Sequence, residues 1–121
     1  MLLRASGEMS GSTVDLAVVN GDLGCDGGVT HGARLVAFTE AVMRGDDASV
    51  ARERAALRAV LSPESFVDVA AVIGSFNVVD RVADATGIPL DAMLDAGSAD
   101  FRPTLNLGRF ASAANTPGGS A

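Results

Sequence analysis

The chain has 121 residues, enough for one hydrophobic core of ordinary size but too few for two. Hydrophobic residues make up 48% of it and aromatic residues only 4%, a balance that suits close helix packing better than a β-sandwich. The formal net charge of -6 repels nucleic-acid phosphates and anionic lipid, so we expect neither nucleic acid nor a membrane as partner.

The start of the chain lacks the features of a targeting segment. Its apolar run is too short for a secretory signal, and the lone Cys25 cannot form an internal disulfide, so a cytoplasmic protein is expected. The longest uncharged apolar run, residues 69–79, covers roughly half of the ~20 residues that a membrane helix needs. Residues 1–11 show no hydrophobic period and are predicted to form an irregular lead-in.

Three helices are expected before residue 62. The first is short, over residues 13–20, and a loop with five glycines in twelve residues, 21–32, follows it. An amphipathic helix is predicted from residue 31 to its closing Gly45. A third helix is predicted over residues 50–61, with its arginines on the solvated side.

A long helix is predicted over residues 63–86. Ser62 supplies a side-chain cap and Pro63 a preset first residue, while Gly87 supplies the flexible stop. Large apolar side chains point in nearly every direction around this helix, so we expect other helices to surround it on several sides.

The remainder of the chain is predicted to be short elements and a tail. A short helix is expected over residues 90–97, and residues 99–110 are apolar enough to lie back on the body. Small and polar residues at 111–121 predict a mobile tail. The prediction is therefore one all-α domain, residues 1–110.

Residues 33–91 resemble the second half of alkylhydroperoxidase D-like proteins of the carboxymuconolactone decarboxylase family. That half has a helix with a pattern like FAEAVTR, then a long helix reading roughly FN-x-x-(N/D)R-x-AD-x-x-G-x-P-L-D. The matching residues are Phe38, Glu40, Ala41, Val42, Phe76, Asn77, Asp80, Arg81, Ala83, Asp84, Gly87, Pro89, Leu90 and Asp91. The resemblance implies a small helical bundle that is incomplete in one chain. It also implies that self-association into trimers or larger homo-oligomers completes the bundle.

The family's catalytic motif is missing from this sequence. In the family, a Cys-x-x-Cys pair, a His one turn later and a preceding Glu carry the peroxidase chemistry, whereas this chain has one Cys and one His. We therefore expect a degenerate or non-peroxidatic oligomeric member. The alternatives are a thiol-dependent peroxidase or an enzyme acting on a small acid or lactone, and a truncated product whose missing helix is encoded upstream.

Cys25 and His31 are the only candidates for catalytic residues. A His within hydrogen-bond reach of a thiol can activate it. However, Asp22 and Asp26 flank the thiol and oppose a thiolate, and the dipole at a helix start disfavours an imidazolium at His31. The favoured interpretation is that the two residues form no reactive pair.

Asn77, Asp80, Arg81 and Asp84 share one face of the long helix because they lie at i, i+3, i+4 and i+7. They are candidates for a substrate-binding site in which Arg81 holds the carboxylate of a small-molecule ligand. The favoured alternative is a structural network, with Arg81 tied to Asp84 and Asn77 bonded to a neighbouring loop or subunit. No cofactor and no metal site is expected.

Overall fold

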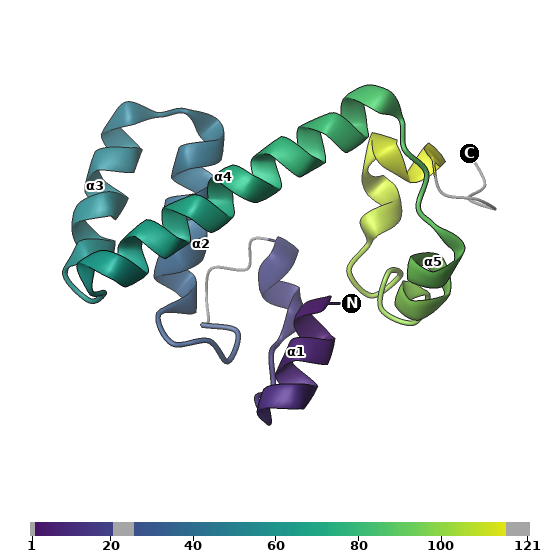
Figure 1. Ribbon diagram of the computed structural model, residues 1–121, viewed down its shortest axis with the longest axis horizontal. Helices are drawn as coiled ribbons and strands as arrows, with labels where there is room; N and C mark the ends of the chain where they lie inside the picture. Colours follow the sequence, from purple (N-terminus) through teal and green to yellow (C-terminus); the bar gives the residue numbers. More distant parts are fainter. Residues whose placement is uncertain (1, 21–25, 116–121) are drawn as a thin grey trace.

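The computed structural model describes residues 2–20 and 26–115, and within those ranges the protein is all-α (Figure 1). The described residues form five α-helices and three short 3-10 helices and include no strand, so the all-α prediction is confirmed. In chain order the elements are α1 (Leu2–Ser10), η1 (Leu16–Asn20), α2 (Gly32–Arg44), α3 (Asp47–Arg58), α4 (Pro63–Thr86), α5 (Ala92–Ser98), η2 (Leu107–Arg109) and η3 (Ala111–Asn115).

Helices α2 and α3 form a hairpin because two adjacent residues reverse the chain. Gly45 adopts a left-handed conformation, φ 69°, and its N–H donates to the carbonyls of Ala41 and Val42, which ends α2. Asp46 then accepts a hydrogen bond from the Ala48 N–H and caps α3. This cap starts α3 three residues before the predicted position.

Helix α4 has the predicted bounds. The Ser65 N–H donates to Ser62 Oγ at 3.2 Å, Pro63 occupies the first turn, and left-handed Gly87, φ 65°, ends the helix. The helix runs diagonally across the molecule, with the α2–α3 hairpin at its first end and the C-terminal segments at its other end (Figure 1).

The core lies where α2, α3 and the first half of α4 meet. Phe38, Leu57 and Ile73, one from each helix, are buried together. The rings of Phe38 and Phe66 lie 5.5 Å apart between centroids in a tilted arrangement, a favourable geometry for aromatic pairs. Partly buried side chains packed around this core are Leu35, Val42, Val50, Leu61, Phe66 and Val69.

Two predictions for the first 20 residues are wrong. The expected lead-in forms helix α1, because the chain folds back on it: the Ser12 N–H donates to the carbonyl of buried Gly7 at 2.8 Å. The expected helix over residues 13–20 is helical only from Leu16, as the 3-10 helix η1. The Asp15 N–H donates to the Gly27 carbonyl at 2.9 Å, a bond to the later loop that holds this backbone out of an α-helix.

The residues after α4 turn back toward the N-terminal part of the chain. Leu105 is buried, and Asn20 Nδ2 donates to its carbonyl at 2.8 Å, which ties this part of residues 99–110 to η1. Of the predicted tail, Ala111–Asn115 forms η3, and residues 116–121 lie outside the described residues.

The sequence predicted that other helices surround α4 on several sides, but the described residues of this chain do not surround it. Its first half packs against α2 and α3 in the core, its second half contacts α2 through Asn77, and no other described α-helix lies along its remaining sides. Neither α4 nor any other helix within residues 2–20 and 26–115 has the length and apolar content required to cross a membrane.

Candidate functional site

The predicted polar row on α4 divides into two pairs. Arg81 Nε donates to Asn77 Oδ1 at 2.5 Å, and Asn77 Nδ2 contacts Met43 Sδ on α2 at 3.1 Å. Asp80 and Asp84 instead face the C-terminal segments, where they line a groove. The amide of Asn77 and the guanidinium of Arg81 therefore lie near α2, while the carboxylates of Asp80 and Asp84 lie at the groove.

This arrangement resembles the structural interpretation more closely than a substrate site. Asn77 joins α4 to α2, as a structural residue would. Arg81 is bonded to Asn77, whereas the structural interpretation expected it to be tied to Asp84. Among the described residues Arg81 and Asp84 form no ion pair. Arg81 is exposed and does not line the groove, so nothing encloses a ligand around its guanidinium. Substrate binding through Asn77, Arg81 and Asp84 stays a prediction.

His31 lies at the start of α2, and Cys25 lies outside the described residues. His31 has left-handed backbone angles, φ 60°, and its side chain makes no capping hydrogen bond. Asp26 serves the helix start instead, because its Oδ1 accepts from the Ala33 N–H at 2.9 Å. The Cys25–His31 pair stays a prediction.

An open groove of about 1430 Å³ lies between the end of α4 and the segments that follow α5. Arg102, which lines the groove, pairs with Asp95, with Nη1 and Oδ1 2.5 Å apart, and both side chains are about 30% exposed. This ion pair fixes the turn after α5. Sequence reasoning missed the groove, since its walls come from segments whose docking no local pattern specifies. Its charged and larger apolar lining residues are Asp80, Asp84, Ile88, Leu90, Asp91, Leu94, Arg102, Leu107, Arg109 and Phe110.

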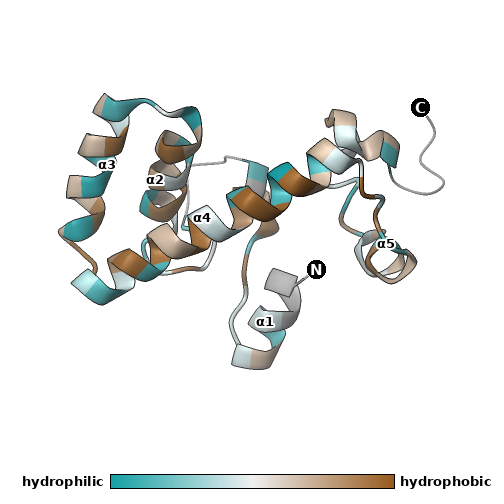
Figure 2. Cartoon of the chain, turned by 45° about the horizontal axis from the view of Figure 1, so that its top comes forward, coloured by the Kyte–Doolittle hydropathy of each residue, from teal (hydrophilic) through white to brown (hydrophobic). Residues whose placement is uncertain are grey.

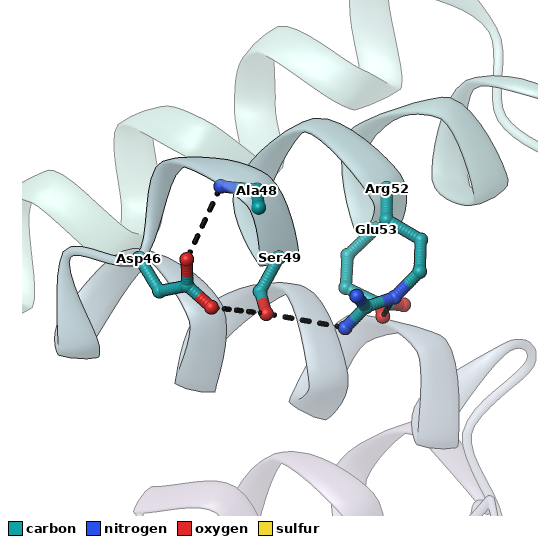
Figure 3. A network of polar contacts seen from close by, with 5 residues as sticks. All are labelled: Asp46, Ala48, Ser49, Arg52 and Glu53. Atoms are coloured by element: carbon teal, nitrogen blue, oxygen red, sulfur yellow. Dashed lines mark hydrogen bonds and ion pairs between the residues drawn. The ribbon is translucent and has the colours of Figure 1, made fainter.

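A network of five residues surrounds the start of α3 (Figure 3). Ser49 Oγ donates to Asp46 Oδ2 at 2.5 Å, and Arg52 donates to Ser49 Oγ at 3.2 Å and pairs with Glu53. The Ser49 hydroxyl lowers the pKa of Asp46 below its usual value, with smaller contributions from the backbone N–H groups of Ser49 and Ala48. Because most of these groups lie in solvent, the network is a helix cap on the predicted solvated face.

Helix α4 carries many exposed apolar residues, and Figure 2 shows them interleaved with polar ones along its length. Its large apolar side chains that are exposed by more than half are Val67, Val72, Phe76, Val78, Val79 and Val82. Gly74 lies among them, and a Cβ added there would have no atom within 4 Å. Exposed large apolar side chains in such number on one helix are typical of interaction sites in soluble proteins.

No group of three or more His, Cys, Asp or Glu side chains in residues 2–20 and 26–115 is placed to hold a metal ion. Compared with protein families, with curated proteins and with solved structures, the chain gives no significant match. The family resemblance of residues 33–91 therefore stays a prediction from the residues that carry it.

Proposed function

We propose that this protein is a self-associating helical subunit that acts through protein–protein contact and has no peroxidase chemistry of its own. The resemblance of residues 33–91 to alkylhydroperoxidase D-like proteins supports this proposal, because that family builds bundles from several chains. The missing Cys-x-x-Cys motif supports a non-peroxidatic or degenerate member.

The observation that carries the proposal is the number of large apolar side chains that α4 exposes. Five valines and Phe76 on this helix are each exposed by more than half. Burying a side chain of this kind stabilises a structure by about 1.5–3 kcal/mol. A helix that exposes several such side chains therefore gains substantially from covering them.

Sedimentation velocity over two orders of magnitude in protein concentration tests self-association. We expect a sedimentation coefficient that rises with concentration, since mass action drives the exposed faces together. A single folded species of monomer mass across that range would contradict the proposal. Far-UV circular dichroism on the same samples checks that the protein remains helical.

A coupled thiol-dependent peroxidase assay tests the absence of redox chemistry. We expect no turnover of an organic hydroperoxide above the rate of a free thiol, because a single cysteine has no resolving partner in the chain. Turnover that Cys25→Ser abolishes would contradict this part of the proposal and favour the peroxidase alternative.

A further inference from the structure

One row of exposed residues runs along α4 beside the side that contacts α2 and α3. Buried and half-buried Phe66, Val69 and Ile73 define the inner side of the helix. At about 100° per residue, a second set of positions lies between roughly a quarter turn and a half turn away from these inner residues. This outer row consists of Glu64, Val67, Ala71, Gly74, Val78 and Arg81, all of them exposed.

The outer row has the spacing of a helix-pairing seam. Its steps are three, four, three, four and three residues, so the row stays on one face of the helix as the seam of a coiled coil does. The order of steps is the same in both directions. A second copy running antiparallel therefore meets each position with another position of the same row.

The residue types also match in the antiparallel direction. With a twofold axis between Ala71 and Gly74, the two small residues oppose each other, so the helix backbones can approach closely. The same axis places Val67 opposite Val78 of the second copy. At the ends it places the Glu64 carboxylate opposite the Arg81 guanidinium. A parallel pair would bring like charges together at both ends.

We propose that two copies of this chain pair antiparallel along the outer row of α4, with Glu64 of each copy facing Arg81 of the other. The inference rests on the proposed self-association and adds its surface and its direction. Charge complementarity selects the outer row, because the other exposed apolar row, Val72, Phe76 and Val79, has no opposite charges at its two ends.

Two properties of the monomer favour this pairing. Arg81 has one hydrogen bond, to Asn77, and within the described residues it forms no ion pair, so its terminal nitrogens can meet a carboxylate. Gly74 faces open space and has no side chain, so a second helix can approach the backbone closely at this position. The row spans about 25 Å at 1.5 Å per residue, a short interface, so we expect a dimer that dissociates on dilution.

A matched pair of valine variants tests the surface. Val78 lies on the outer row and Val79 beside it, with exposures of 64% and 61%. We expect Val78→Ser to weaken dimerisation by roughly tenfold or more and Val79→Ser by less than about twofold, measured by sedimentation equilibrium. Both positions are exposed, so circular dichroism should show both variants folded.

A charge exchange tests the direction. We expect Glu64→Arg and Arg81→Glu each to weaken dimerisation by about tenfold, because each change introduces like charges twice per dimer. The double variant should recover the wild-type dissociation constant. An equimolar mixture of the two single variants should form heterodimers, since each charge then meets its opposite.

The outcomes separate this inference from the proposed function. Wild-type self-association without rescue in the double variant, or with equal effects of Val78→Ser and Val79→Ser, would overturn the antiparallel pairing and leave self-association intact. A wild-type protein that stays monomeric would overturn both.

Discussion

The two halves of α4 have similar composition but different surroundings. Around Ile73 the first half meets α2 and α3 and contributes to the core, whereas none of the described residues in or packed against that core lies in the second half. The difference lies in the elements that face each half. A helix hairpin covers the first half, while short turns and 3-10 segments lie near the end of the second.

This contrast shows that apolar content alone does not bury a helix. Burial requires a second apolar surface of matching length, and the α2–α3 hairpin is the only one that the described chain places along α4. The covered side of the first half therefore contributes to the stability of the monomer, while exposed apolar side chains remain on both halves, among them Val67 and Val78.

Leu57→Ala should produce the largest loss of stability. Leu57 is fully buried, so its truncation leaves a cavity and should lower the free energy of unfolding by about 2–5 kcal/mol. Val79→Ala, a truncation on the exposed half, should cost less than about 0.5 kcal/mol at concentrations where the protein is monomeric. Urea unfolding followed by circular dichroism measures both. Equal costs would show that the two halves are not distinguished by burial.

Gly28→Ala should give the next largest effect, because it disturbs backbone contact between the loop and residues 12–15. Gly28 has φ 81°, and a Cβ there would lie 2.1 Å from the Thr13 carbonyl oxygen. We expect a loss of about 2–4 kcal/mol. Gly11→Ala is the control, since Gly11 has φ 69° with nothing within 4 Å and should cost about 1–2 kcal/mol for the backbone alone. Identical losses would contradict the close approach.

Ser62→Ala should have a smaller effect, confined to the start of α4 and therefore to its core-bound half. The Ser65 N–H would lose its acceptor, and the free energy of unfolding should fall by about 1 kcal/mol. Ser75→Ala removes an exposed hydroxyl from the middle of the same helix and should be neutral or stabilising by a few tenths of a kcal/mol. A destabilisation by Ser75→Ala equal to that of Ser62→Ala would argue against the cap.

Lowering the pH should slightly reduce the stability of the α2–α3 hairpin, because Asp46 becomes protonated. Its pKa is lowered in the folded state, so its contribution is present above its ordinary value of 3.8 and is lost as the pH falls through the lowered value. Between pH 7 and pH 3, thermal unfolding should show a larger drop in Tm for the wild type than for Asp46→Asn. The other carboxylates affect both proteins equally, so identical drops would exclude this contribution.

The sequence predicts the long helix well because its end signals are local. Ser62, Pro63 and Gly87 fix both bounds of α4 through their own side chains and backbone freedom. It fails at residues 1–20, where the deciding contacts are distant or depend on the fold. The Asp15 N–H donates to the Gly27 carbonyl, 12 residues later in the chain, and no periodicity in either segment predicts this hydrogen bond.

For the candidate site, the sequence predicted only which residues share a side of α4 and not what those residues contact. Helical spacing places Asn77, Asp80, Arg81 and Asp84 along one side of α4, but it does not show that Asn77 binds Met43 while the two carboxylates face a groove. The groove itself depends on where residues 99–115 settle. Those residues follow a chain reversal held by the Asp95–Arg102 ion pair, which only the three-dimensional structure reveals.

The bond between Asn20 and the Leu105 carbonyl closes a loop of 85 residues. Most of that loop is already ordered as α2, α3 and α4, and one partly solvated amide bond contributes only about 0.5–1.5 kcal/mol to holding its two ends together. The C-terminal third can therefore detach and re-dock while Phe38, Leu57 and Ile73 remain packed. Proteases will cut first in this third, and the N-terminal helices will persist as the resistant fragment.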